Sequence, residues 1–242
     1  MAYGDFGSLA FEGREYEPQA QCALSVPHRL PSGARGYAVS IQALAMQTDP
    51  LLFPALPKAL RHCTRSRQLS FVAGRLCAME ALRQLGISQF DVVSGDSGEP
   101  LWPSGVVGAI THSVDFACAA VTMRVPGTLG LGIDSEKIVD DVALRDIAAV
   151  CLTDSERAQL HNANNAELRA TVAFSLKESF YKAIHPMVRR FVDYQELEVD
   201  EIDLKHGCAM LRPRLPDWHP CRALVGLFAV RDGHVHSSVL IQ

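Results

Sequence analysis

The sequence lacks any apolar run long enough to cross a membrane. Its longest stretches without Asp, Glu, Lys or Arg, 36–48 and 100–114, are shorter than the roughly 18 residues that a spanning helix needs, and Gly, Pro or polar residues interrupt both. The N-terminal segment lacks the basic head and apolar run of a signal peptide and carries acids instead, at Asp5, Glu12, Glu15 and Glu17. We therefore expect a protein without a membrane span, located in the cytoplasm.

Several motif classes are also missing. The seven cysteines include no C-x-x-C pair, and their odd number leaves one without a partner in any set of disulfides, so we expect buried, reduced thiols. No spacing of Cys and His suits zinc, and neither the phosphate-binding P-loop nor the G-x-S-x-G turn of α/β-hydrolases occurs. These absences argue against zinc proteins, P-loop nucleotide hydrolases and serine hydrolases of that fold.

Charge is unevenly spread along the chain. The formal net charge is −4, from 23 Lys and Arg against 27 Asp and Glu, whereas nucleic-acid-binding proteins normally carry a basic face. Residues 58–83 nevertheless contain one acid, Glu80, against six basic residues: Lys58, Arg61, Arg65, Arg67, Arg75 and Arg83. The sequence thus predicts no nucleic-acid partner but a local basic segment suited to a compact anion.

The spacing of apolar residues predicts both helices and strands after residue 60. Apolar residues recur every three or four positions over 66–85, which indicates an amphipathic helix ended by Gly86. The other expected elements are strands at 106–111, 116–125, 129–138, 192–199, 223–230 and 235–241, and helices at 142–150, after the Thr153–Glu156 capping box, and at 166–184 before Pro186. The first sixty residues are interrupted by prolines and are expected to be mostly loop. A long helix and several strands in each half predict an α+β fold of two similar lobes.

Two carboxylates share one face of the strand expected at 129–138. Because alternate side chains of a strand point the same way, Asp134 and Glu136 project together, while Ile133 points into apolar packing. Paired carboxylates repel unless a cation lies between them, and a small set of oxygen ligands suits Mg²⁺, which often shares its coordination shell with phosphate oxygens. The alternative is a charged edge-strand face that Lys137 neutralises.

Two further segments carry candidate groups. On the helix expected at 166–184, Glu178 and Lys182 lie one turn apart, which is also the commonest ion-pair arrangement on helix surfaces. At the end of the first hairpin strand, His112 lies between the hydroxyls of Thr111 and Ser113 and could bind a phosphate monoester or serve only in packing. The local patterns leave both alternatives open.

Taken together, these segments resemble the 4′-phosphopantetheinyl transferases. The order T-H-S (111–113), G-I-D-S-E (132–136) and F-S-L-K-E-S-F-Y-K (174–182) resembles that family, and most closely its members that serve enterobactin-type siderophore synthesis. Further matching segments are S-F-V-A-G-R (70–75), G-E-P-L-W-P (98–103), L-T-D-S-E (152–156) and F-V-D-Y-Q (191–195). The resemblance covers roughly residues 66 to 200.

The resemblance implies a fold and an activity. The fold would be a pseudo-twofold pair of α/β lobes, each a long helix packed on a small, mainly antiparallel sheet. The lobe at 1–125 would bind the phosphates of coenzyme A, the lobe at 126–242 would hold Mg²⁺ and the catalytic residues, and the active site would lie in the cleft between them. The reaction would move the 4′-phosphopantetheine arm of coenzyme A to a serine of apo acyl or peptidyl carrier proteins, in fatty-acid or siderophore synthesis. A fused pair of lobes would act as a monomer.

The resemblance also implies roles for the residues that match the family's motifs. The metal ligands would be Asp134, Glu136 and Glu178, and the contacts to coenzyme A phosphates would be Arg67, Arg75, Lys177 and Lys182, with Thr111 and His112 at the 3′-phosphate. Glu178 would be the base that activates the carrier serine, directly or through a bound water, or would serve only as a metal ligand. Lys182 would stabilise or protonate the leaving adenosine 3′,5′-bisphosphate. The alternatives are a Mg²⁺-dependent pyrophosphatase acting on nucleotides or coenzyme A, and a non-catalytic coenzyme A-binding protein.

Overall fold

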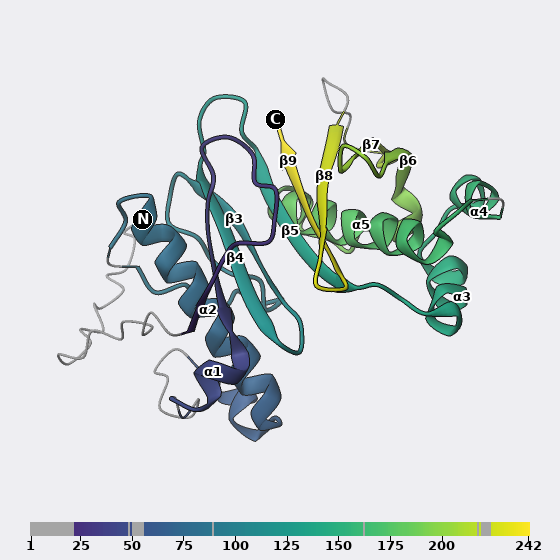
Figure 1. Ribbon diagram of the computed structural model, residues 1–242. Helices are drawn as coiled ribbons and strands as arrows, with labels where there is room; N and C mark the ends of the chain where they lie inside the picture. Colours follow the sequence, from purple (N-terminus) through teal and green to yellow (C-terminus); the bar gives the residue numbers. More distant parts are fainter. Residues whose placement is uncertain are drawn as a thin grey trace.

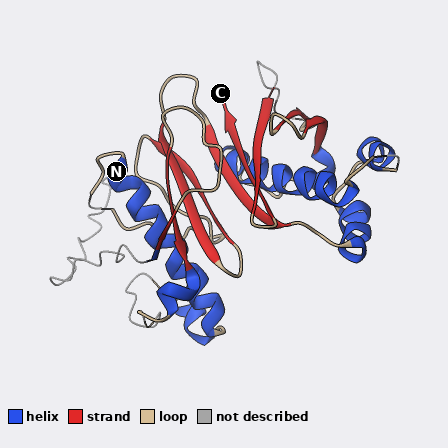
Figure 2. Cartoon of the chain, viewed as in Figure 1, coloured by secondary structure: helices blue, strands red, loops and turns tan. Residues whose placement is uncertain are grey.

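The computed structural model describes residues 22–47, 49, 56–88, 90–161, 163–216, 218 and 224–242. The acidic N-terminal residues and the first part of the predicted N-terminal lobe lie outside the described residues. In the described part, two antiparallel sheets stand between two long helices (Figure 1), and the colouring by secondary structure separates the strands from the helices that cover them (Figure 2). This confirms the predicted α+β fold of two lobes.

The first sheet is built from residues 23–123. Its strand order is β1-β2-β4-β3, with bounds β1 Ala23–Leu24, β2 Arg35–Ser40, β3 Val106–His112 and β4 Phe116–Met123. The hairpin of β3 and β4 agrees with the prediction, and so does the long helix α2, Arg65–Gln84, which covers one face of this sheet. Thr64 caps α2 by accepting a hydrogen bond from the Arg67 backbone. The short helices α1, Ile41–Ala45, and η3, Lys58–His62, adjoin α2.

The second sheet is built from residues 130–241. Its order is β5-β9-β8-β7-β6, with bounds β5 Gly130–Lys137, β6 Leu197–Asp203, β7 Cys208–Pro213, β8 Leu224–Arg231 and β9 His234–Ile241. The helices of this half are α3 Asp141–Val150, α4 Asp154–Leu160, α5 Ala166–Val188 and the short η4 Tyr194–Glu196. The predicted capping box of α4 forms, because Thr153 and Glu156 exchange side-chain and backbone hydrogen bonds.

The two sheets face each other across a shared apolar layer. Alternate residues of β4 pack under α2, and the residues between them point toward the second sheet. This shared layer contains Ala38, Val107, Ala109, Phe116, Cys118, Ala120, Leu131 and Ile133. The layers therefore follow the order α2, first sheet, second sheet, α5 (Figure 1), and β3 lies beside β5 where the sheets meet. The predicted boundary between the lobes, at residues 125 and 126, lies in the segment that links β4 to β5. The division into lobes at this point stays a prediction.

Several predictions of local structure are wrong. Helix α5 runs through Pro186 to Val188, because a proline in the last turn removes only one helical hydrogen bond. Residues 192–196 are not strand: Asp193 caps η4 instead, and β6 begins at Leu197. Strand β2 lies in the segment expected to be mostly loop, and β7 was not predicted at all.

The cysteines and the membrane prediction can be checked on the described residues. The six described cysteines are free, and four of them, Cys22, Cys77, Cys118 and Cys151, are buried. In the part of the chain that the structure describes, no helix is both long and apolar enough to cross a membrane.

Candidate active site

Two glycines allow α5 to lie directly on β5. A Cβ atom on Gly132 would come 1.8 Å from the carbonyl oxygen of Ser179, and one on Gly130 would come 2.0 Å from that of Ala183. Backbone atoms cannot yield as a flexible side chain can, so only glycine permits this approach. Because α5 is this close, its residues from Ser175 to Lys182 lie opposite the next inward-facing residue of the strand, Asp134.

Asp134 is the centre of a polar cluster that joins both lobes. Its carboxylate is buried, with Oδ1 2.7 Å from Lys182 Nζ and Oδ2 accepting a hydrogen bond from Ser175 Oγ at 2.9 Å. From the first sheet, Thr111 Oγ1 donates to Oδ1 at 3.5 Å. Lys182 Nζ also donates to the carbonyl of Ile133 at 3.2 Å. The predicted projection of Asp134 away from Ile133 is therefore observed, since Ile133 packs in the layer between the sheets.

The other two carboxylates lie within electrostatic reach of this cluster. Burial, and next the charge of Asp134, raise the pKa of Glu136 to about 7; Lys182 opposes this rise and Glu178 adds to it. Glu178 Oε1 accepts a hydrogen bond of 2.5 Å from the hydroxyl of Tyr194. The cluster thus carries more negative than positive charge, a condition that a bound cation would relieve.

The donor set suits Mg²⁺ in kind but is not assembled as a cage. Three carboxylates are the hard oxygen ligands that Mg²⁺ prefers. Among the described residues, however, no group of three His, Cys, Asp or Glu side chains is arranged to hold a metal ion. One reason is visible at Asp134, where the Lys182 ammonium and the Ser175 hydroxyl already engage both carboxylate oxygens.

Thr111 and His112 point to different sides of the first sheet. Consecutive residues of a strand alternate, so Thr111 faces Asp134 while His112 lies beside α2, with its Nε2 3.3 Å from the Arg67 guanidinium. Partial desolvation of the ring, and next the charge of Arg67, lower the pKa of His112, with Lys182 acting in the same direction. Both side chains nevertheless reach the surface, where the Arg67 guanidinium supplies positive charge and the His112 ring a hydrogen-bonding group next to the carboxylate cluster.

Arg75 is not part of that surface. It is buried in the first lobe, donates to Ser94 Oγ at 2.8 Å and stacks over the Phe71 ring at 4.5 Å. Burial lowers its pKa to about 10. Its Nε has no hydrogen-bond partner among the described residues. The structure therefore does not bring Arg75 together with Arg67, although the sequence predicts the same role for both.

The prediction for Lys177 needs correction. Its ammonium is buried and donates three hydrogen bonds, to Glu156 Oε2 and to the carbonyls of Cys151 and Tyr194, at 2.8, 2.9 and 2.8 Å. An ammonium has three protons, so none is left for a phosphate. Desolvation lowers the pKa of Lys177, and the Glu156 hydrogen bond opposes that shift. The observed contacts of Lys177 therefore do not fit the predicted phosphate contact. Lys182 lies five residues further along α5 and is partly buried at the cluster.

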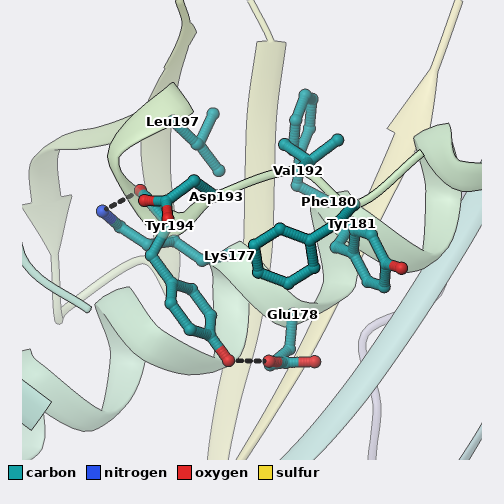
Figure 3. A pocket seen from close by; sticks show the side chains of 9 residues that line it. Lys177, Glu178, Phe180, Tyr181, Val192, Asp193, Tyr194 and Leu197 are labelled. Carbon is teal, nitrogen blue, oxygen red and sulfur yellow. Dashed lines mark hydrogen bonds between the residues drawn. The ribbon is translucent and has the colours of Figure 1, made fainter. Parts of the chain in front are cut away.

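The sequence did not identify Tyr194 as a site residue. It lies in η4, and residues of its segment and of α5 together line a cavity of about 70 Å³ (Figure 3). The cavity is lined by Lys177, Glu178, Phe180, Tyr181, Phe191, Val192, Asp193, Tyr194 and Leu197. The available signal was the F-V-D-Y-Q segment, whose tyrosine could not be placed beside Glu178 without the course of the chain after α5.

Comparisons with known proteins agree with the resemblance in the sequence. The chain matches the model of the 4′-phosphopantetheinyl transferase N-terminal domain over residues 56–122 and that of the 4′-phosphopantetheinyl transferase superfamily over residues 130–237. Enterobactin synthase component D of Salmonella typhi is 33% identical over 159 residues, which are 65% of this chain and 65% of that protein. The 4′-phosphopantetheinyl transferase PptT of Mycobacterium tuberculosis is 32% identical over 158 residues, which are 64% of this chain and 68% of that protein.

Among solved structures, a holo-acyl-carrier-protein synthase of Thermotoga maritima is similar with a TM-score of 0.39 and 19% identity, over 48% of this chain and 64% of that one. That similarity is too small to support an argument. The two sequence matches cover about two thirds of this chain and span about two thirds of the length of each relative. The chain belongs to the 4′-phosphopantetheinyl transferase superfamily.

Proposed function

We propose that this protein transfers the 4′-phosphopantetheine arm of coenzyme A to a serine of an apo carrier protein. The products are the holo carrier protein and adenosine 3′,5′-bisphosphate. The observation that carries the proposal is the cluster in which Asp134 joins Lys182 of α5 to Thr111 of the other sheet. Family membership supports the same reaction.

The acidic residues are proposed to hold Mg²⁺ on the pyrophosphate of coenzyme A. The ligands would be Asp134, Glu136 and Glu178. Bound Mg²⁺ would neutralise charge that develops on the phosphate oxygens during transfer. Burial, and next the charge of Asp134, raise the pKa of Glu136, and a bound cation would favour its ionised form. Since the Lys182 ammonium now pairs with Asp134, the metal would compete with it, which would leave Lys182 available to a phosphate.

The chain's own residues would then position the substrate and move the proton. The serine oxygen of the carrier attacks the phosphorus that bears pantetheine, and the bond from that phosphorus to the bridging oxygen breaks. Glu178 accepts the serine proton, and Lys182 stabilises the nucleotide that leaves with the bridging oxygen. Arg67 and His112 bind the 3′-phosphate from the first lobe, a role that their exposed pairing supports. Thr111 is better placed to orient Asp134 than to reach this phosphate.

The carriers are proposed to be small acyl or peptidyl carrier proteins. Relatives named enterobactin synthase component D support a siderophore pathway, and carriers of fatty-acid synthesis are also proposed. We further propose that the enzyme acts as a monomer, because residues from both lobes of one chain form the cluster. A location in the cytoplasm is also proposed.

Intact mass spectrometry of a carrier tests this function directly. The protein is incubated with coenzyme A, Mg²⁺ and apo carriers from a peptide-synthetase and a fatty-acid system, with a parallel sample in EDTA. We expect the carrier to gain the mass of phosphopantetheine only when the metal is present. No mass gain on any carrier would refute the transferase. Cleavage of coenzyme A without a carrier would instead indicate a pyrophosphatase, and binding of coenzyme A without either reaction would indicate a non-catalytic binder.

A further inference from the structure

We propose that Tyr194 is a positioning residue that orients the Glu178 carboxylate for proton transfer. This inference rests on the proposed function, because it assigns Tyr194 a task in the same site. It also explains why Lys177 is buried, although it lies in the segment 174–182 that resembles the family's motif.

The contact itself is short and well supported. The Tyr194 hydroxyl donates to Glu178 Oε1 at 2.5 Å, and Figure 3 shows the two side chains meeting at the edge of the cavity. Hydrogen bonds from a hydroxyl to a carboxylate have this length when they are charge-assisted. The Tyr194 ring also packs against Phe174, one turn before Glu178, with 5.7 Å between ring centroids. Ring packing and hydroxyl thus fix the tyrosine against one face of α5.

The backbone of Tyr194 is held from the other side. Lys177 Nζ donates to the Tyr194 carbonyl at 2.8 Å (Figure 3) and to Glu156 Oε2 at 2.8 Å. Glu156 is itself fixed, since Oε2 accepts from the Thr153 backbone and Oε1 from that of Val199. Lys177 precedes Glu178 on the helix, so one residue anchors the tyrosine backbone while the next receives its hydroxyl. The buried ion pair therefore locates the segment that orients the carboxylate.

This arrangement has a chemical consequence for Glu178. The tyrosine engages one acceptor site of Oε1, so the remaining sites of the carboxylate stay available to the cation and the proton that we propose for Glu178. An ionised carboxylate only accepts hydrogen bonds, so a bond from Tyr194 selects one rotamer of Glu178 with its charge retained. In this contact the phenol carries the hydrogen and the carboxylate only accepts, so Tyr194 is the donor and Glu178 the acceptor. Proton acceptance then falls to Glu178.

Replacing Tyr194 by phenylalanine tests the hydroxyl alone. Tyr194→Phe keeps the packing on Phe174 and the backbone bond to Lys177. We expect kcat for carrier modification to fall at least about tenfold, with the KM for coenzyme A within about twofold, as for other groups that orient a catalytic residue. Tyr37→Phe, which removes a hydroxyl in the first lobe, should leave both constants unchanged. Gln195→Ala, which removes a bond from the same segment to the Leu152 carbonyl, should lower kcat less than Tyr194→Phe.

A second measurement needs no turnover. The protein contains five tyrosines, so ¹³Cζ-labelled tyrosine gives a spectrum simple enough to assign by single substitutions. In the metal-free protein, Glu178→Ala should shift the Tyr194 resonance and leave that of Tyr37 in place. A kcat in Tyr194→Phe within twofold of wild type, or a Tyr194 resonance that does not move in Glu178→Ala, would overturn the inference. If the wild-type protein modified no carrier, the proposed function would fail, and the spectrum would still decide whether Tyr194 holds Glu178.

Discussion

Two lysines five positions apart on α5 differ in what surrounds them. The side chain of Lys177 is 1% exposed and pairs with Glu156, which is 4% exposed; Lys182 is 26% exposed and pairs with Asp134. All three protons of Lys177 are used inside the protein, whereas Lys182 borders the cluster that we assign to the reaction. At the scale of single residues, burial therefore distinguishes the lysine whose protons are all used inside the protein from the one that we propose for the reaction.

Removing the buried lysine should unfold the protein more readily. Lys177→Met leaves the Glu156 carboxylate buried without a cation, and breaking a buried pair in this way costs about 3–5 kcal/mol. Urea unfolding followed by circular dichroism measures this loss. Lys182→Met is the matched control and should cost less, because Lys182 is 26% exposed and its ion pair with Asp134 is therefore partly screened by solvent. Unchanged stability in Lys177→Met, with a raised KM for coenzyme A, would return Lys177 to the phosphate site.

His112 should discriminate between coenzyme A and its 3′-dephospho form. If His112 and Arg67 bind the 3′-phosphate, His112→Ala removes a hydrogen bond to a charged group and should raise the KM for coenzyme A about tenfold. The KM for 3′-dephospho-coenzyme A should change little. Steady-state kinetics with both substrates measure the difference. An equal increase for both substrates would contradict the assignment to the 3′-phosphate.

At the scale of elements, the close packing of α5 against β5 brings the residues of the candidate active site together. Gly130 and Gly132 let the helix backbone approach the strand, and this approach brings Glu178 and Lys182 to Asp134. The positions of these glycines alternate with Leu131 and Ile133, which face the other sheet. The segment L-G-I-D therefore serves packing on one face and chemistry on the other.

Gly132→Ala should displace α5. Its Cβ would lie 1.8 Å from a backbone oxygen of Ser179, so we expect a loss of about 3 kcal/mol, the upper end for overpacking, together with loss of transfer activity. Gly226→Ala is a matched control in β8: its Cβ would meet the end of the Leu176 side chain at 2.4 Å, which can move. Thermal unfolding of both variants tests this. A Gly132→Ala protein as stable and as active as Gly226→Ala would contradict the role of the close approach.

The elements that the sequence predicted well are those with a strong local signal. The spacing of apolar residues gave α2 within one residue at each end, and the capping box at Thr153 gave the start of α4. Strand β2 was missed because it has little local pattern and is stabilised by pairing with β4, more than 70 residues away. The segment 192–196 contains β-branched and aromatic residues, which are typical of a strand. Asp193 instead accepts a hydrogen bond from the Gln195 backbone and caps the short helix η4.

At the scale of the whole molecule, residues 28 and 29 tie the N-terminal segment to the second sheet. His28 Nε2 contacts the Asp134 carbonyl at 3.0 Å and Ser135 Oγ at 3.1 Å, and Ser135 in turn contacts His236 Nδ1 at 3.0 Å. Because a carbonyl only accepts, Nε2 of His28 carries the proton. Arg29 donates to the carbonyl of Gly207 at 3.0 Å. These contacts link the lobes directly behind the strand that carries Asp134.

The two buried histidines should make the fold sensitive to acid. Burial lowers the pKa of His28 to about 3 and that of His236 to about 4, whereas both would titrate near 6.5 in the unfolded chain. The unfolded chain therefore binds more protons below pH 6.5, so stability is fully present above that pH and falls as the pH drops. Between pH 7.5 and 5 we expect a loss of up to about 2 kcal/mol for each histidine.

Urea unfolding at pH 7.5 and at pH 5 measures this dependence. His28→Gln and His236→Gln remove one titrating group each and should each lose less stability over this range than the wild-type protein. His206→Gln, at an exposed turn, is the control and should keep the wild-type dependence. If the His28 and His236 variants kept the full wild-type slope, other groups would have to account for the acid sensitivity.

The sequence by itself determined the family, the two-lobed α+β fold and the carboxylates and lysine that form the cluster, because these depend on short motifs and local periodicity. The tertiary structure decided which candidates share a site. In the folded chain Lys177 and Arg75 are buried, Thr111 contacts Asp134, and the Tyr194 hydroxyl donates to Glu178. The physical reason is that burial and hydrogen-bond partners depend on segments far apart in the chain, and side chains with the same chemistry acquire different roles when only one of them remains accessible to a ligand.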